Sequence, residues 1–322
     1  MPINNSFSKP ALIAIDWGNT RFRCWLLDIN GNEIDNIDTE FGISKIKDTT
    51  FSQVFENIMG GWFHEHGSLP VIASGMIGSR HGWLETPYIP CPAGPEEFAK
   101  HLVYVSLNIE NTNIPKKIAI VPGMSYWDEG VPDLMRGEET QVAGFLWDKQ
   151  QSGWIVLPGT HSKWVLTTAG KIKAFKTFMS GEIFALMVEH SILQKLIEGN
   201  QLDENAFKRG CIQSFNSQQG LLNQLFSART MGLLNQVEAK GIHSFISGII
   251  IGCEIKEGMS LDAHNFSLDD AEVNLIGEIS LCNLYRHAFE IANIKVNLVN
   301  NNPVVKGLFH IAGAASLYRT YE

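Results

Sequence analysis

Residues 12–23 read LIAIDWGNTRFR, and this stretch decides how the chain begins to fold. Its apolar, β-branched start predicts a strand that carries one acid, Asp16, near its C-terminal end. The small residues at 18–20 predict a tight turn, and the run CWLLD at 24–28 predicts the returning strand. The chain is therefore expected to open with a β-hairpin.

The turn of this hairpin has the composition of a phosphate-binding loop. A glycine at position 18 lets the backbone approach a ligand closely, and adjacent N–H groups form a concave anion site over Gly18, Asn19 and Thr20. A carboxylate cannot bind phosphate directly, so Asp16 needs a cation between them, and Mg²⁺ fits. We include Arg21 in this predicted phosphate site; the alternative is a plain strand with an acidic turn.

Composition narrows the class of protein. With 322 residues the chain is long enough for two domains or one large one, and 44% apolar with 18% charged residues is typical of a globular enzyme. A net charge of −9 argues against a nucleic-acid partner, and no apolar stretch or leader suggests a membrane. Five scattered cysteines without a CxxC pair predict free thiols in the cytoplasm rather than a zinc site.

A second glycine loop, LPGTHSK at 157–163, mirrors the first. Gly159 and Thr160 stand between two predicted strands, and His161 and Lys163 add cationic groups that can bind phosphate. Strands followed by helices, repeated once, predict an α/β fold of two similar lobes with a ligand cleft. We assign the N-terminal lobe to 1–150 and the C-terminal lobe to 151–322.

Apolar periodicity predicts the remaining elements. Helices are expected at 51–66, 142–147, 182–198 (with Ser180 as N-cap), 203–216, 221–235, 244–255, 281–292 and 304–318. Further strands are expected at 70–73, 117–121, 154–157, 164–168, 172–177, 273–276 and 294–298. Prolines and glycines predict an irregular functional loop over 74–95.

The segment Arg136-Gly137-Glu138-Glu139 lies just before the predicted helix at 142–147. A carboxylate after a glycine, between two phosphate loops, is placed to take a proton from an attacking hydroxyl, as phosphoryl transfer requires. The alternative is an acid that merely complements the helix dipole. In the loop over 74–83, Arg80 is the best candidate for a clamp on a carboxylate or phosphate.

Several segments, in matching order along nearly the whole chain, resemble the 2-dehydro-3-deoxygalactonokinase family. They read AIDWGNTRFRCWLLD, ASGMIGSRHGWLETPYIPCPAG, VPGMS, PDLMRGEETQVAGFL, LPGTHSKWVL and FMSGEIFALM. That family resembles the actin, hexokinase and Hsp70-like ATPase superfamily. The resemblance implies two ribonuclease-H-like lobes around a central nucleotide cleft.

The resemblance also implies roles for single residues. Glu138 takes the place of the catalytic base, as glutamate instead of aspartate, with Glu139 as the fallback. The implied ATP and phosphate contacts are Gly18, Asn19, Thr20, Arg21, Gly159, Thr160, His161, Lys163 and Gly277, and Asp16 is the implied catalytic and magnesium residue. The implied sugar-acid contacts are Met76, Ser79, Arg80, Trp83 and Arg136.

The activity that the resemblance implies is phosphorylation of 2-dehydro-3-deoxy-D-galactonate at its 6-hydroxyl, with ATP and Mg²⁺ as cofactors. Other readings stay open: a kinase for a related sugar acid or sugar, a non-catalytic ATP-binding regulator, or, with less support, a phosphatase of the same superfamily. Small kinases of this kind are often dimers, so a homodimer is a further expectation.

Overall fold

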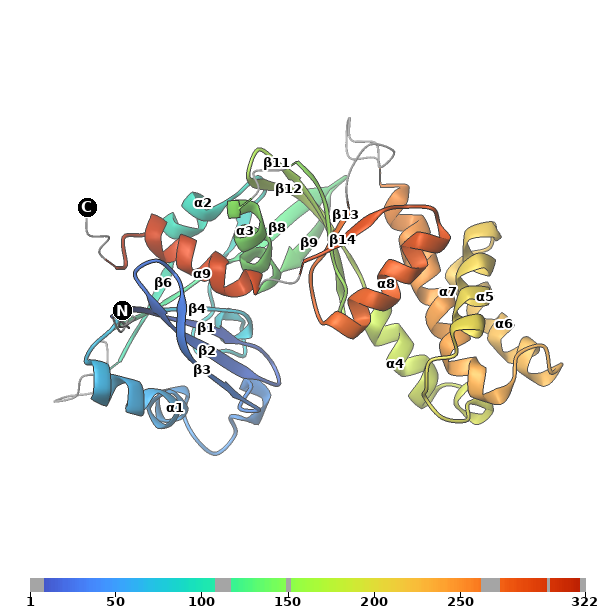
Figure 1. The fold of residues 1–322 in the computed structure, drawn as a ribbon, viewed down its shortest axis with the longest axis horizontal. Helices are drawn as coiled ribbons and strands as arrows, with labels where there is room; N and C mark the ends of the chain where they lie inside the picture. The colour runs from blue at the N-terminus through green and yellow to red at the C-terminus, as the bar shows by residue number, and fades with distance from the viewer. Residues whose placement is uncertain (1–8, 108–116, 149–151, 262–272, 300–301, 319–322) are drawn as a thin grey trace, which may run out of the picture. The chain divides into compact units, whose positions relative to one another are not determined.

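The computed structural model describes residues 9–107, 117–148, 152–261, 273–299 and 302–318, which form two compact units (Figure 1). Unit 1 comprises Met1–Ser152, Thr167–Lys173 and Asn301–Glu322, and unit 2 comprises Gly153–Leu166 and Ala174–Asn300. The lobe boundary predicted between 150 and 151 lies outside the described residues. Residues 167–173 and 301–322 belong to unit 1, although they lie in the part of the sequence assigned above to the C-terminal lobe. The lobe bounds given above stay a prediction.

Unit 1 is built on a six-stranded sheet with the order β3-β2-β1-β4-β7-β6. Its strands are β1 (Pro10–Trp17), β2 (Phe22–Asp28), β3 (Glu33–Thr39), β4 (Val71–Ser74), β6 (Val103–Ser106) and β7 (Lys117–Ile120). Strands β1 and β2 are antiparallel, which confirms the predicted opening hairpin, whereas β4 runs parallel to β1. The strand β3 was missed because its isoleucines, Ile34 and Ile37, do not alternate with polar residues at the strand period.

Helices cover both faces of this sheet (Figure 1). On one face, α1 (Phe51–His66) begins in a capping box formed by Thr50 and Gln53, and it spans the residues predicted for it. On the other face, α9 (Pro303–Ala314) packs on β1 and on α3 (Glu138–Asp148). The backbones of α3 and α9 are so close that a Cβ atom on Gly144 would lie 2.6 Å from the Gly307 nitrogen.

A smaller sheet with the order β5-β8-β9 completes unit 1, together with α2 (Pro95–Lys100). Its strands are β5 (Tyr88–Pro90), β8 (Gly123–Asp128) and β9 (Val131–Met135). The prediction of an irregular segment over 74–95 was therefore wrong in part, since it contains β5 and the 3₁₀ helix η2 (Met76–Gly78). Proline is compatible with β5 because β5 lies at the edge of its sheet.

Unit 2 has a five-stranded sheet with the order β12-β11-β10-β13-β14, which repeats the order β3-β2-β1-β4-β7 of unit 1. Its strands are β10 (Gly153–Leu157), β11 (Ser162–Thr168), β12 (Lys171–Phe178), β13 (Val273–Leu275) and β14 (Val296–Leu298). In both sheets the first strand runs parallel to the strand that follows the intervening helices. Two similar α/β lobes, as predicted, are thus confirmed.

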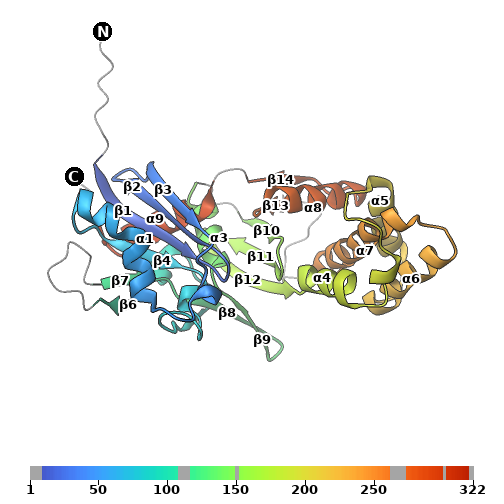
Figure 2. The same ribbon diagram turned by 90° about the horizontal axis from the view of Figure 1, so that it is seen from below.

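The helices of unit 2 form a bundle beside this sheet (Figure 2). They are α4 (Ser180–His190), α5 (Glu204–Asn216), α6 (Leu221–Leu233), α7 (Ala239–Met259) and α8 (Ile279–Ile291), with the 3₁₀ helix η3 (Gln194–Leu196). The predicted helix over 182–198 was too long, because Ser191 leaves the helix in an extended conformation. The predicted N-cap was also wrong: Met179 takes that position.

The longest of these helices, α7, packs tightly on α5 through its glycines. A Cβ atom on Gly248 would lie 3.0 Å from the Cys211 nitrogen, so the two backbones are in contact. Within the described part of the chain, α7 and the other helices are all too short or too polar to cross a membrane.

Candidate functional site

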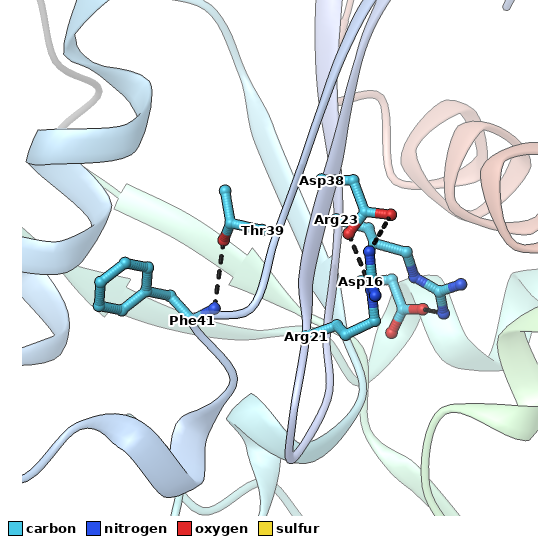
Figure 3. A network of polar contacts seen from close by, with 6 residues as sticks. All are labelled: Asp16, Arg21, Arg23, Asp38, Thr39 and Phe41. Atoms are coloured by element: carbon cyan, nitrogen blue, oxygen red, sulfur yellow. Dashed lines mark hydrogen bonds and ion pairs between the residues drawn. The ribbon is translucent and has the colours of Figure 1, made fainter.

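The acid of the first loop, Asp16, lies near the end of β1, opposite Arg23 of β2 and Ser74 of β4. Figure 3 shows the Arg23 guanidinium donating a hydrogen bond to one carboxylate oxygen, Oδ2. The other oxygen, Oδ1, faces Gly75, where a Cβ atom would come within 3.1 Å of it. Burial raises the pKa of Asp16 above its ordinary value, although Arg23 acts in the opposite direction.

The turn at 18–20 is held from behind by the segment 42–44. The Asn19 carbonyl accepts hydrogen bonds from the backbone N–H of Ser44 at 3.1 Å and from its hydroxyl at 2.7 Å. The Gly42 N–H donates to the Thr20 carbonyl at 3.2 Å. The residues Asn19 and Thr20 are exposed, and hydrogen bonds to their carbonyls tie the turn to the segment 42–44.

The predicted phosphate ligand Arg21 is engaged with a neighbouring strand. Its guanidinium forms an ion pair with the Asp38 carboxylate of β3 at 2.9 Å, and both side chains are about half exposed (Figure 3). An exposed pair of this kind is weak and exchanges readily. Arg21 therefore lies beside the first loop but is not fixed on it.

The two neighbouring acids Glu138 and Glu139 occupy the first turn of α3, not the approach to a later helix as predicted. Gly137, with φ +108°, lets α3 start against β4: a Cβ atom there would lie 3.3 Å from the Gly75 Cα. Since Gly75 also contacts Asp16, the structure brings the start of α3 next to the first loop. This places the predicted base and the predicted magnesium ligand in one part of unit 1.

Burial distinguishes the two acids. Glu139 is fully buried, and its carboxylate accepts the Gly137 N–H at 2.7 Å. Glu138 is partly exposed and accepts the Arg136 N–H at 3.1 Å. Burial, and then the Glu138 carboxylate, raise the pKa of Glu139 to about 8. Of the two, Glu138 is the carboxylate that a substrate can reach, which favours it as the base.

The residues predicted to hold the sugar acid divide into two groups. Trp83 packs on the core, stacked on Phe51 with ring centroids 5.9 Å apart. The Arg136 guanidinium donates to the Thr86 hydroxyl and carbonyl and lies 4.3 Å from the Tyr88 ring centroid. These two side chains therefore hold the loop itself.

The second group comprises Met76, Ser79 and Arg80. Arg80 is exposed, Met76 is half-buried, and Ser79 is buried with a hydroxyl that has no hydrogen-bond partner within the described residues. A buried hydroxyl without a partner is costly unless a ligand or water supplies one. Arg80 is thus the exposed member of this group, and Ser79 is a buried one whose hydroxyl lacks a partner among the described residues.

In unit 2 the second loop forms one wall of a cavity of about 550 Å³. Its other walls come from the start of α4, the segment 200–202, α7 and the start of α8. Of the residues predicted here, Gly159 and Thr160 line the cavity, whereas His161, Lys163 and Gly277 do not. His161 pairs instead with Glu182 at 2.5 Å, and Lys163 donates to the Thr177 hydroxyl at 2.8 Å.

The start of α4 abuts the second loop. The Glu182 N–H donates to the Thr160 carbonyl at 3.0 Å. A Cβ atom on Gly181 would lie 2.8 Å from the Thr160 Cα and would also collide with the Gly159 carbonyl oxygen. The loop can therefore keep this shape only while position 181 has no side chain.

The far wall of the cavity combines an aromatic side chain with polar groups. The ring of His243 meets Phe184 edge-on at 5.0 Å, and burial lowers the pKa of His243. Asn200, Ser247 and Glu278 also line the space. An apolar cavity with a few converging polar groups is typical of a small-molecule site.

Sequence reasoning missed the buried support of the second loop. Glu254, Tyr285, Ser162 and Ser180 form a hydrogen-bond network beneath it. The one available signal was an acid inside the apolar run of α7, IIIGCEI at 249–255.

The chain is similar to known proteins over nearly its whole length. The sequence profile of the 2-keto-3-deoxy-galactonokinase family matches residues 16–311. The 2-dehydro-3-deoxygalactonokinase of Escherichia coli strain K12 is 29% identical over 94% of this chain and 98% of its own length. A protein of Rhizobium meliloti strain 1021 assigned to the same activity is 31% identical over 94% of this chain and 96% of its own length.

Solved structures are also similar to this chain over nearly its whole length. A crystal structure from Sinorhizobium meliloti, assigned as a 2-dehydro-3-deoxygalactonokinase protein, has a TM-score of 0.82 and 30% identity over 94% of this chain and 98% of that one. Component A of the (R)-2-hydroxyglutaryl-CoA dehydratase of Acidaminococcus fermentans has a TM-score of 0.50 and 10% identity, covering 95% and 99%. The second likeness concerns the fold alone. The predicted class, an α/β fold of two similar lobes, is confirmed.

Proposed function

Because the chain belongs to the 2-keto-3-deoxy-galactonokinase family, we propose that it transfers the γ-phosphoryl group of ATP to the 6-hydroxyl of 2-dehydro-3-deoxy-D-galactonate. The observation that carries this proposal is the family match over 16–311, which includes both glycine loops and the acids at the start of α3. Relatives that bear the name of this activity cover nearly all of the chain.

In this proposal the cavity of unit 2 binds ATP. The backbone of Gly159 and Thr160 faces the phosphates, and a volume of about 550 Å³ accommodates a nucleoside. Phe184 and His243 supply an aromatic wall for the base. Gly277 takes part only through the bend that leads into Glu278, which does line the cavity.

Magnesium is the proposed metal, and the residues of the first loop fit it. Mg²⁺ in phosphoryl-transfer enzymes takes one or two carboxylates, with phosphate and water oxygens as the other ligands. Asp16 offers one such carboxylate, since its Oδ1 is not used by Arg23. Among the described residues there is no cluster of three metal-binding side chains, so no all-protein metal cage competes with this assignment. The bound ion would neutralise charge on the transferring phosphoryl group.

Glu138 is the proposed general base. It accepts the proton of the 6-hydroxyl as the oxygen attacks, while the helix start of α3 and Arg136 N–H hold the carboxylate in place. Arg80 is proposed to bind the carboxylate of the sugar acid, and the Ser79 hydroxyl to hydrogen-bond one of its oxygens. Met76 completes the contact surface, and Trp83 and Arg136 keep the loop in shape.

A coupled ADP-release assay tests the reaction directly. With Mg·ATP, ADP release should depend on 2-dehydro-3-deoxy-D-galactonate and should be much slower with its gluconate epimer or with no acceptor. Faster ADP release with the epimer would show that the substrate is a related sugar acid. ATP binding without turnover on either acceptor would favour a non-catalytic regulator.

We also propose that the enzyme works in the reducing cytoplasm. Support comes from its five cysteines, which are all free thiols. A homodimer stays a proposal that size-exclusion chromatography with light scattering would test.

A further inference from the structure

A carboxyl group lies buried in unit 2, in the middle of the apolar helix α7. Glu254 is only 3% exposed, and it does not line the cavity. Its Oε1 accepts the indole N–H of Trp164 at 2.9 Å, and its Oε2 accepts the Tyr285 hydroxyl at 2.6 Å. Burying a carboxylate is expensive, so a chain that keeps one here needs all these donors to offset the cost.

The network continues from Glu254 to the second loop. The Tyr285 hydroxyl has one proton, which it donates to Glu254, so its oxygen can accept from the Ser162 hydroxyl at 2.9 Å, and Ser162 also forms a hydrogen bond with Glu254. The proton of Ser162 is then committed, and its lone pairs face the Gly159 N–H, 3.4 Å away. The ionised form of Glu254 therefore fixes the direction of every hydrogen bond down to the loop.

Glu254 also reaches the other side of the loop. The Ser180 hydroxyl forms a further hydrogen bond with it, at the first residue of α4. From there Gly181 and Glu182 contact the loop backbone, the latter through its N–H to the Thr160 carbonyl at 3.0 Å. One carboxyl group thus connects both supports of the residues that face the cavity.

We propose that Glu254 is a positioning residue for the phosphates of the nucleotide, acting through Tyr285, Ser162 and Ser180 on the loop of Gly159 and Thr160. It touches neither substrate. This inference rests on the proposed function, because it takes the second loop to be the phosphate site. A merely structural acid in the same place would stabilise unit 2 without any selective effect on nucleotide binding.

The test compares three variants with the wild-type full-length protein. Glu254→Gln replaces one acceptor oxygen with a donor that faces Trp164 or Tyr285. Tyr285→Phe removes the hydroxyl that donates to Glu254 and, with it, the link to Ser162. Glu257→Gln is the matched control, since Glu257 is an exposed carboxylate on the same helix. Circular dichroism and thermal melting check that each variant is folded.

The expected result is selective. Glu254→Gln and Tyr285→Phe should each raise the KM for ATP about tenfold, in keeping with the loss of hydrogen bonds to a buried charge, and leave the KM for the sugar acid within about twofold. Glu257→Gln should match the wild type. Equal changes in both KM values, or a lower melting temperature with an unchanged KM for ATP, would overturn the positioning role.

Calorimetric titration with Mg·ADP separates this inference from the proposed reaction. If the wild type turns over no sugar acid, the proposed reaction fails, but a Kd for Mg·ADP that rises about tenfold in both Glu254→Gln and Tyr285→Phe would still support Glu254 as a positioning residue, because Glu254, unlike Tyr285, does not line the cavity. If Tyr285→Phe and Glu254→Gln are folded and bind Mg·ADP as the wild type does, the inference is wrong even when the kinase reaction is found.

Discussion

The two glycine loops have similar sequences but different supports. The first, at 18–20, follows a strand with an acid near its end. The ion pairs Asp16–Arg23 and Arg21–Asp38 lie beside it, with Asp16 largely buried and the other three side chains about half exposed. The second, at 158–161, has no acid in its strand, β10. Its carboxyl group comes from Glu254 on a distant helix and lies buried under the loop.

This difference suggests a division of roles. A carboxylate beside a loop, with one oxygen that its arginine partner does not occupy, can bind a metal ion and take part in chemistry. A carboxylate beneath a loop, with both oxygens accepting hydrogen bonds from the protein, can only fix the shape of the loop. We therefore expect changes in the first loop to reduce turnover and changes in the second to reduce nucleotide affinity.

The largest expected effect is that of Glu138→Gln in unit 1. The amide cannot accept the proton of the acceptor hydroxyl, so kcat should fall about a thousandfold. The coupled ADP-release assay measures kcat, and Mg·ADP titration checks that binding is kept. Turnover within a few fold of wild type would show that Glu138 is not the base.

Asp16→Asn should have the next largest effect. The neutral amide is a weak metal ligand, so kcat should fall about a hundredfold and higher Mg²⁺ should restore part of it. A magnesium titration of the steady-state rate measures both. Arg23→Gln is the control: it removes the guanidinium from Asp16 but keeps the carboxylate, so the magnesium requirement should persist. A rate that does not depend on Asp16 would leave the first loop without a metal.

Glu139→Gln tests how the buried acid Glu139 differs from the partly exposed acid Glu138. The pKa of Glu139, raised from 4.5 to about 8, means that the folded protein keeps a proton which the unfolded chain loses. Its contribution to stability is full below pH 4.5 and is lost as the pH rises through 8. Glutamine does not titrate, so its free energy of unfolding does not fall with pH in this way. Relative to wild type, the free energy of unfolding of the variant should therefore rise by at least about 2 kcal/mol between pH 5 and pH 8. Urea unfolding at both pH values measures this; a constant difference would contradict it.

Arg21→Gln is expected to have the smallest effect. Its guanidinium shares an exposed ion pair with Asp38, so the melting temperature should hardly change, and the KM for ATP should rise by about threefold at most. Asp38→Asn is the complementary variant, because it frees Arg21 and should leave the KM for ATP unchanged or lower. A loss of turnover in Arg21→Gln would place this side chain among the catalytic groups.

Local sequence patterns predicted much of the fold. The hairpin of β1 and β2 and the exact span of α1 follow from alternation, turn residues and a capping box, all of which act over a few residues. Strands β8 and β9 were missed because the run MSYWDEGVPDLM at 124–135 contains a proline, charges and few alternating apolar residues. Pairing within the sheet decides their conformation instead, since β8 pairs with β5 and β9 pairs with β8.

The residues of the candidate site were likewise predictable only where they belong to a short sequence motif. Asp16 and Glu138 stand in short motifs, so the sequence indicated them, but Arg23 and Gly75 contact Asp16 only through the register of the sheet. The network under the second loop joins residues 90 and 123 positions apart. No local pattern specifies which distant hydroxyl meets a buried acid.

Calorimetric titration of Mg·ADP into Glu138→Gln and Gly181→Ala tests the division of roles most directly. A methyl group at 181 would collide with the backbone of the second loop, whereas position 138 belongs to the other unit. We predict that Glu138→Gln binds Mg·ADP as the wild type does, and that folded Gly181→Ala binds at least about tenfold more weakly. Loss of binding in Glu138→Gln together with full binding in Gly181→Ala would contradict it.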